Sequence, residues 1–302
     1  MDWAISAVGF AFVLIGLREL FHTLFHPTGE AWLTRAVIGV TWQLVKRIDR
    51  RGSLLVLAGP LGMVNVFFVW VGLLGTGFAL VVWRHLETNF VFQNLDPAEH
   101  SGFVDALYFS FVTLATLGYG EITPATTLFR LITPGEAIIG FVLLTAVISW
   151  VLSIYPALTR LRRLAVAVNT FVDARVRVPD ASVAHTFHDF ADRTLEVRMD
   201  FVHHPVVYYF HAPDLRSSLP AALPVLRRLA LEYEATGDAD ERLGAATARI
   251  AVEDLAHAIA REFLGHTDVE PERALAVYAE DHGVDVGDEE LGHEQVKGVA
   301  QR

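Results

Sequence analysis

The sequence predicts an all-α membrane protein with a mainly helical soluble domain in its C-terminal half. Of the 302 residues, 53% are hydrophobic, and the mean hydropathy of +0.38 is high for a soluble protein. The charge is uneven, because residues 1–163 carry 11 Lys+Arg and 10 Asp+Glu, whereas residues 164–302 carry 13 and 25. A near-neutral membrane half therefore precedes an acidic half, whose charge argues against nucleic acid as a partner.

Two segments precede the main membrane region. Residues 1–29 contain an apolar run without the basic start or small-residue cleavage site of a secretory signal peptide, so we expect an N-terminal transmembrane helix. Residues 30–53 have an apolar centre too short for a comfortable span, with tryptophans and flanking bases that are typical of a membrane interface. An interfacial amphipathic helix is favoured. A short additional span is the alternative, and it would move the N-terminus to the other side of the membrane.

Residues 54–157 contain two spanning runs, 54–83 and 128–155, on either side of a shorter apolar run, 103–115. The short run makes about three and a half helical turns. It cannot cross a bilayer, so we expect a re-entrant helix. Its carbonyl end carries partial negative charge, which favours a cation at that point.

The segment Thr116-Leu117-Gly118-Tyr119-Gly120 follows this short helix. A dehydrated cation needs a column of oxygens, which an extended backbone of alternating left- and right-handed residues supplies. Glycine enters the left-handed region without a Cβ penalty, and Gly118 and Gly120 stand at alternate positions. The segment resembles the selectivity filter of potassium channels, with Leu117 where valine is commonest. That resemblance implies K⁺ as the transported ion, bound by the carbonyls of Thr116, Leu117, Gly118 and Tyr119 and by the Thr116 hydroxyl. It implies no organic cofactor.

The resemblance is to single-pore bacterial channels, and it implies a homotetramer embedded in the lipid bilayer, because one filter per chain cannot encircle an ion. It places Glu121 at the pore mouth and Tyr119 against the surrounding pore helix. Gly140 falls where such channels have a hinge, and on physical grounds it admits either a bend or a close helix contact. A row of apolar residues at four-residue steps could form a cavity wall and gate or contact lipid: Leu144, Ile148 and Leu152.

Two further residues depart from the simple pore pattern. Val112 stands where some bacterial channels carry an acid that braces the filter. Glu136 is an acid within a predicted span and so is a functional candidate. For Glu136 we expect an ion pair with Arg130 behind the filter.

The flanking bases predict the orientation. One cluster precedes the first pore span and another follows the second: Lys46, Arg47, Arg50 and Arg51, then Arg160, Arg162 and Arg163. Both clusters belong on the cytoplasmic side. We therefore expect a multi-pass protein of the cell (inner) membrane, with the filter mouth facing outward and the C-terminal domain in the cytoplasm.

Residues 158–283 read as a helical domain, and residues 284–302 as a polar, disordered tail. An apolar stripe at helical spacing marks one of the helices: Ala248, Val252, Leu255, Ile259 and Phe263. The last helix begins either with a capping box at Thr267 and Glu270 or at Pro271. The sequence lacks the glycine-rich turn of a Rossmann gating domain.

The chain offers no residue arrangement typical of an enzyme, and the absence of cysteine excludes thiolate chemistry. The sequence therefore predicts a passive potassium-selective channel subunit. The alternatives are a membrane-anchored sensory or scaffold protein with an inactive pore, and a weakly selective cation channel. An unknown cytosolic ligand, or protons, are candidate regulators of the C-terminal domain. Five clustered histidines could sense protons or could be ordinary surface residues: His185, His188, His203, His204 and His211.

Overall fold

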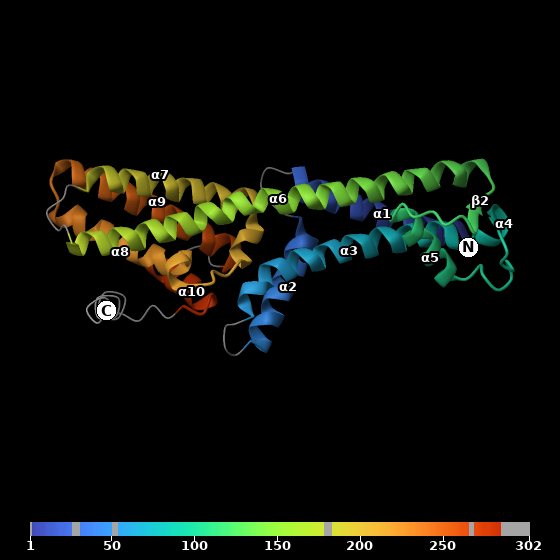
Figure 1. Cartoon of the computed structure of the whole chain (residues 1–302), viewed down its shortest axis with the longest axis horizontal. Helices are drawn as coiled ribbons and strands as arrows, with labels where there is room; N and C mark the ends of the chain where they lie inside the picture. The colour runs from blue at the N-terminus through green and yellow to red at the C-terminus, as the bar shows by residue number, and fades with distance from the viewer. Residues whose placement is uncertain (1, 26–30, 50–53, 178–182, 266–268, 285–302) are drawn as a thin grey trace. The chain divides into compact units, whose positions relative to one another are not determined.

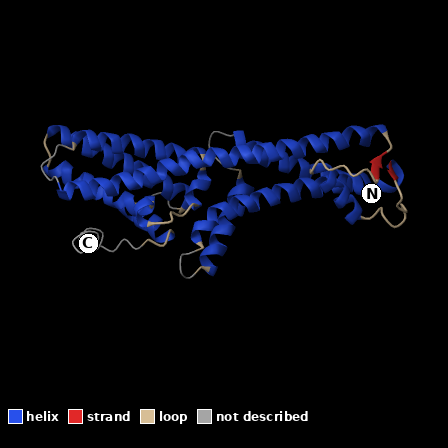
Figure 2. Cartoon of the chain, in the orientation of Figure 1, coloured by secondary structure: helices blue, strands red, loops and turns tan. Residues whose placement is uncertain are grey.

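The computed structural model describes residues 2–25, 31–49, 54–177, 183–265 and 269–284. Nearly all of this chain is helical (Figure 2), so the protein is an all-α membrane protein, as the sequence predicts. In chain order the elements are α1 (Asp2–Phe25), α2 (Trp32–Ile48), α3 (Leu55–Trp83), α4 (Leu86–Asn89), β1 (Phe90–Phe92), α5 (Phe103–Leu114), β2 (Ile122–Pro124), α6 (Thr127–Arg177), α7 (Ala184–His203), η1 (Pro205–Tyr209), η2 (Leu215–Ser217), α8 (Leu219–Thr236), α9 (Ala239–Phe263) and α10 (Pro271–Asp281) (Figure 1).

Three of the described helices are long and apolar enough to cross a membrane: α1, α3 and α6. They coincide with the three predicted spans, although α6 continues without a break for 51 residues. With 17 residues, α2 is not among them. The 12-residue α5 is apolar but too short to cross a bilayer.

The chain divides into two compact units. The first unit comprises residues 1–41 and 61–153, and the second comprises residues 42–60 and 154–302. The second unit therefore includes a stretch of chain around the start of α3 as well as the C-terminal helices.

In the first unit, α1 runs antiparallel to α3 at very close range. A Cβ atom on Gly9 would lie 2.4 Å from the Gly77 carbonyl oxygen, and one on Gly77 would lie 2.9 Å from that of Gly9. Earlier in α1, the Ser6 hydroxyl donates to the Val81 carbonyl at 3.1 Å. Later in α1, Gly16 meets Leu74. Such close approach of small residues is typical of helix packing in membranes.

A buried apolar cluster holds α5 in the first unit. It joins residues from α3, α4, the two strands, α5 and the start of α6: Ala79, Val82, Leu86, Phe90, Ala106, Phe109, Ile122 and Phe129. The connection between α3 and α5 is not a simple loop, because it contains α4 and β1. Strand β1 pairs antiparallel with β2, and Val91 lies opposite Thr123.

The second unit is built mainly of α7, α8, α9 and α10, with α9 packed against the other three (Figure 1). Four members of the predicted apolar stripe are buried: Ala248, Val252, Leu255 and Ile259. Besides α9, which carries this stripe, the predicted helical domain contains α7 and α8, and Pro220 lies in the first turn of α8. Pro271 occupies the first turn of α10, as one alternative predicted; Thr267 and residues 285–302 lie outside the described residues.

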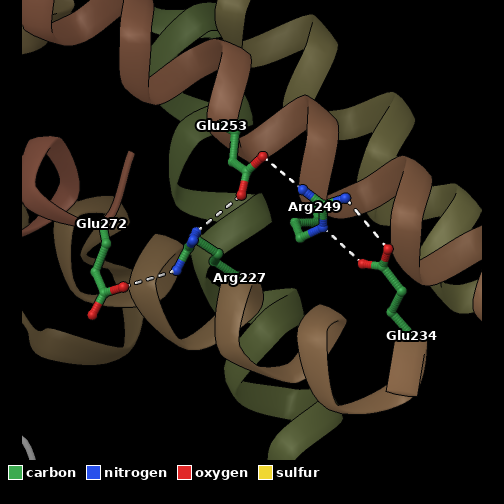
Figure 3. Close-up of polar contacts among 5 residues, drawn as sticks. All are labelled: Arg227, Glu234, Arg249, Glu253 and Glu272. Carbon is green, nitrogen blue, oxygen red and sulfur yellow. Dashed lines mark hydrogen bonds and ion pairs between the residues drawn. The ribbon is translucent and has the colours of Figure 1, made fainter. Parts of the chain in front are cut away.

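Two arginines and three glutamates tie α8, α9 and α10 together (Figure 3). Arg249 bonds to Glu234 through Nε at 2.7 Å and to Glu253 through Nη1 at 2.8 Å. Arg227 bonds to the same Glu253 at 3.2 Å and to Glu272 at 3.4 Å. Because each arginine has two acidic partners, the ion pairs form a network, which is worth more than isolated surface pairs.

Candidate functional site

The candidate site begins at α5, whose ends are both well defined. Its N-cap is Gly102, and the Asp105 side chain accepts a hydrogen bond from the Gly102 amide at 3.1 Å. A carboxylate here complements the positive end of the helix dipole. After Leu114 the helix stops, and the chain enters the predicted filter segment.

The backbone of residues 116–120 alternates in handedness. Thr116, Gly118 and Gly120 have φ values of +58°, +56° and +92°. The intervening Leu117 and Tyr119 are not among the positive-φ residues. This is the alternation that a column of carbonyl ligands requires. Apart from the adjoining residues, no atom of the described chain lies within 4 Å of a Cβ built on Gly118 or Gly120, so the need for glycine comes from backbone conformation.

Thr116 was not predicted to be left-handed, and a β-branched residue is costly in that region. Hydrogen bonds from the start of the filter back to α5 hold the conformation. The Thr116 amide donates to the Thr113 carbonyl at 2.9 Å, and the Leu117 amide donates to the Val112 carbonyl at 2.9 Å. Val112 thus contacts the predicted filter segment through its backbone carbonyl, although its side chain is not acidic.

Within one chain, the side chains of the filter are open to the surroundings. Leu117 is 58% exposed and Tyr119 is 67% exposed. The predicted contact of Tyr119 with a pore helix is therefore not made within its own chain. Glu121 does contact α5, because the Tyr108 hydroxyl donates to its carboxylate at 2.5 Å. Just beyond it, β2 returns the chain alongside β1.

Gly140 is the point where α6 meets the end of α5. A Cβ on Gly140 would lie 1.8 Å from the Leu114 carbonyl oxygen, so no side chain fits there without moving backbone. Of the two roles that the sequence left open, the structure shows the close helix contact.

An apolar cavity of about 350 Å³ lies beside this contact. It is lined by residues from α3, α5, the filter and α6: Phe67, Val71, Phe111, Leu114, Ala115, Thr116, Gly140, Phe141, Leu143 and Leu144. The structure thus brings Thr116, Gly140 and Leu144 to one cavity. Ile148 and Leu152 are not among its lining residues, and both are more than half exposed.

The expected ion pair between Glu136 and Arg130 was wrong. The Glu136 carboxyl group instead contacts the Ser110 hydroxyl of α5, which also lies 2.9 Å from the Gly75 carbonyl oxygen of α3. Arg130 is exposed and lies on another face of α6. Ser110 and Gly75 were overlooked as site residues. The available signal was a serine in the middle of an otherwise apolar, aromatic helix.

The second unit contains a polar cluster that the sequence reading missed. Asp281, at the end of α10, accepts hydrogen bonds from Lys46 Nζ at 2.7 Å, Trp42 Nε1 at 3.2 Å and the Tyr208 hydroxyl at 2.7 Å. Burial acts to raise the pKa of Asp281, but the hydrogen bonds from Lys46 and Tyr208 leave it below its ordinary value. The neighbouring His282 is 2% exposed, and burial lowers its pKa to about 3.

The five predicted histidines do not form one cluster with a shared partner in the described chain. His188 Nδ1 lies 2.9 Å from the Ala184 carbonyl oxygen of its own helix. Burial lowers the pKa of His204 and of His211. Only His211 approaches the cluster at Asp281, with its ring 6.2 Å from that of His282. Among the described residues, no group of three or more metal-ligating side chains could hold a metal ion.

Comparisons with known proteins agree with a channel. A family model described as "Ion channel" (Ion_trans_2) matches residues 78–155, which include α5, residues 116–120, Glu136 and Gly140. The uncharacterised membrane protein YdjJ of Bacillus subtilis (strain 168) is 26% identical over 68% of this chain. Two pore potassium channel c of Oryza sativa subsp. japonica is 48% identical over 17% of the chain, and two-pore potassium channel 4 of Arabidopsis thaliana is 33% identical over 30%.

The chain spans 62% of the length of the Bacillus protein, and 12% and 35% of the two plant proteins. No solved structure matches the chain. Residues 78–155 are therefore similar to an ion-channel domain, in a chain with three helices long and apolar enough to cross a membrane among its described residues.

Proposed function

We propose that the chain is one subunit of a passive, potassium-selective channel. The observation that carries this proposal is the alternating backbone of Thr116, Gly118 and Gly120 at the end of a short re-entrant helix. Carbonyl oxygens of Thr116 to Tyr119 and the Thr116 hydroxyl would replace the hydration shell of K⁺. The potassium channels of rice and Arabidopsis, to which parts of this chain are similar, support K⁺ as the ion.

Four copies of the chain would form the pore. One filter strand cannot surround an ion, and a closed ring of identical subunits supplies the rest. The exposure of Leu117 and Tyr119 in a single chain supports this assembly, because two large apolar or aromatic side chains beside the ion path gain a partner in a neighbouring subunit. Glu121 would attract cations at the mouth of the pore. Leu144, Ile148 and Leu152 would line the central ion pathway of the tetramer, which is distinct from the apolar cavity within each chain.

The antiparallel contact of α1 with α3 supports a definite orientation. Three crossings put the start of α1 on the side of the filter mouth and the C-terminal unit on the opposite side, which the basic residues assign to the cytoplasm. In this arrangement α2 lies along the membrane surface. The protein would reside in the cell (inner) membrane.

Ion flux into liposomes tests the proposal, with K⁺ and Na⁺ compared for the purified protein. The parent chain is expected to pass K⁺ in preference to Na⁺. Gly118→Ala is expected to abolish that flux, because alanine costs about 1–2 kcal/mol in the left-handed region. Gly135→Ala is the matched control, since Gly135 lies in α6 with no atom within 4 Å of an added Cβ and no positive φ.

The alternatives predict different results in the same assay. Equal flux of both ions would support a weakly selective cation channel. A stable tetramer that passes neither ion would support a sensory or scaffold protein with an inactive pore.

A further inference from the structure

Glu136 is a buried acidic residue within α6, a helix long and apolar enough to cross a membrane. Its residue is 1% exposed, and among the described residues no ion pair involves it. Its Oε1 contacts the Ser110 hydroxyl, whereas its Oε2 is fully buried and has no hydrogen-bond partner in the described chain. Atoms of the same chain cover Oε2, so in this conformation a neighbouring subunit has no access to it.

The single proton of the Ser110 hydroxyl favours one protonation state of Glu136. A serine hydroxyl carries one proton and can donate only once. The Ser110 oxygen lies within hydrogen-bond distance of both the Gly75 carbonyl and Glu136 Oε1. A carbonyl oxygen and an ionised carboxylate are both acceptors, so they would compete for that single proton. Both contacts are satisfied when Ser110 donates to Gly75 and a protonated Glu136 donates to Ser110.

The surroundings favour the same state. Burying an ionised carboxylate without a cation is far costlier than burying a neutral acid, and such groups take up a proton instead. The lack of a partner for Oε2 is likewise less costly for a neutral carbonyl-type oxygen than for half of a carboxylate.

This contact lies next to the hydrogen bonds that shape the filter. Ser110 is one helical turn before Leu114, and Glu136 is one turn before Gly140, so α5 and α6 meet at two consecutive turns. Between these two points, the Val112 carbonyl receives the Leu117 amide. On the α3 side, Gly75 has no room for a Cβ, which would lie 2.5 Å from the Phe111 ring.

We propose that protonated Glu136 is a positioning residue that holds α5, and through it the first residues of the filter, between α3 and α6 by donating a hydrogen bond to Ser110. Its effect on ion selectivity rests on the proposed function. The hydrogen bond and the protonation state of Glu136 do not depend on the proposed function, and infrared spectroscopy tests them separately.

Infrared spectroscopy of the purified protein at neutral pH measures the protonation state. The parent chain is expected to show a carboxylic-acid carbonyl band that is absent in Glu136→Gln and shifted in Ser110→Ala. Glu87→Gln, an exposed acid in α4, is the control and is expected to leave the band unchanged. A parent spectrum in which Glu136→Gln removes no such band overturns the protonated state.

Flux selectivity measures the positioning role. Glu136→Gln keeps a donor for Ser110 and is expected to retain the K⁺ preference of the parent. Glu136→Leu removes the donor to Ser110, and Ser110→Ala removes its acceptor. Both are expected to lower K⁺ over Na⁺ preference by about tenfold, because the hydrogen bond that positions α5 is lost in each and such a bond is worth roughly the free energy of a tenfold change. Ser110→Ala removes a single oxygen atom and keeps the test available if Glu136→Leu does not assemble.

The outcomes separate this inference from the proposed function. Parent-like selectivity in both Glu136→Leu and Ser110→Ala overturns the positioning role. A parent chain that passes no K⁺ overturns the proposed function, while the infrared band still decides whether Glu136 donates to Ser110.

Discussion

Lys46 Nζ lies 2.7 Å from Asp281 Oδ1, although 235 residues separate the two in sequence. Both belong to the second compact unit, where the end of α2 meets the end of α10. Trp42 and Tyr208 donate to the other oxygen of the same carboxylate. The chain that enters α3 is therefore fastened to the last described helix through one acidic side chain.

Replacing Asp281 with alanine should destabilise the second unit by about 3 kcal/mol. The main loss comes from the buried Tyr208 hydroxyl and Trp42 indole, which would lack an acceptor. Lys46→Met should cost less than about 1 kcal/mol, since the lysine end of the pair is open to water. Thermal unfolding in detergent measures both, with the exposed Glu280→Ala as control. Equal losses for Asp281→Ala and Lys46→Met would assign the stability to the ion pair instead.

The stability of this region should fall in acid because of His282. Burial is the main cause of its low pKa. The nearby positive charge of Lys46 and the neighbouring His211 lower the pKa further, whereas the negative charge of Asp281 raises it. The folded pKa of about 3 lies below the ordinary value of 6.5. Below pH 6.5 the unfolded chain binds a proton at His282 that the folded chain does not bind. The contribution of neutral, buried His282 to stability is therefore complete above pH 6.5 and is lost as the pH falls toward 3.

The measurement is the unfolding free energy against pH, whose slope should include about 1.4 kcal/mol per pH unit from this group. The other titratable side chains that face His282 are Tyr208, Tyr278, Asp281 and His211. The raised pKa values of the two tyrosines keep them out of this window. Burial lowers the pKa of His211, so this residue adds to the slope in the same direction as His282. His282→Leu should flatten the profile. An unchanged slope in this variant would mean that another group is responsible.

Gly140→Ala should impair assembly and flux far more than Gly135→Ala. The first places a methyl group against the Leu114 carbonyl, which is backbone and cannot rotate away, whereas the second enters open space on the same helix. We expect Gly140→Ala to cost about 1–3 kcal/mol or more. The yield of tetramer on a detergent sizing column gives the answer. A hinge role alone would allow normal assembly and alter only channel opening.

The orientation can be tested cleanly because the chain contains no cysteine. Single cysteines at Trp3 and at Ala98 should both react with a membrane-impermeant maleimide in intact cells. A cysteine at Leu243, in α9, should react only after permeabilisation. If residues 32–48 crossed the membrane as an additional span, the cysteine at Trp3 would behave like the one at Leu243.

The spans, α5 and the left-handed backbone of Gly118 and Gly120 could be predicted because local patterns determine them. An 18-residue apolar run, a shorter apolar helix and glycines at alternate positions are each readable without knowing what lies nearby. The left-handed Thr116 could not be predicted in this way. Its conformation depends on hydrogen bonds to carbonyls of α5, and threonine by itself disfavours it.

The contacts of buried polar residues were the least predictable part. Glu136 was assigned to Arg130, the nearest base in sequence, but helix phase turns Arg130 outward and brings in Ser110 from α5. His282 was overlooked for a similar reason. The rings that bury it come from α2, η1 and α10, and no local pattern indicates that Trp42 and Tyr208 would surround it.

The facing glycines of α1 and α3 set the depth at which α1 is inserted. Two apolar helices in lipid gain little from hydrophobic burial, so close packing decides where they meet. Moving α1 by one turn, about 5.4 Å, would bring Ile5 or Val13 to the Gly77 backbone, where not even a methyl group fits. Sliding is therefore blocked in both directions. The contact between Gly9 and Gly77 therefore determines the position of α1 along α3, and with it how far the start of α1 emerges from the bilayer.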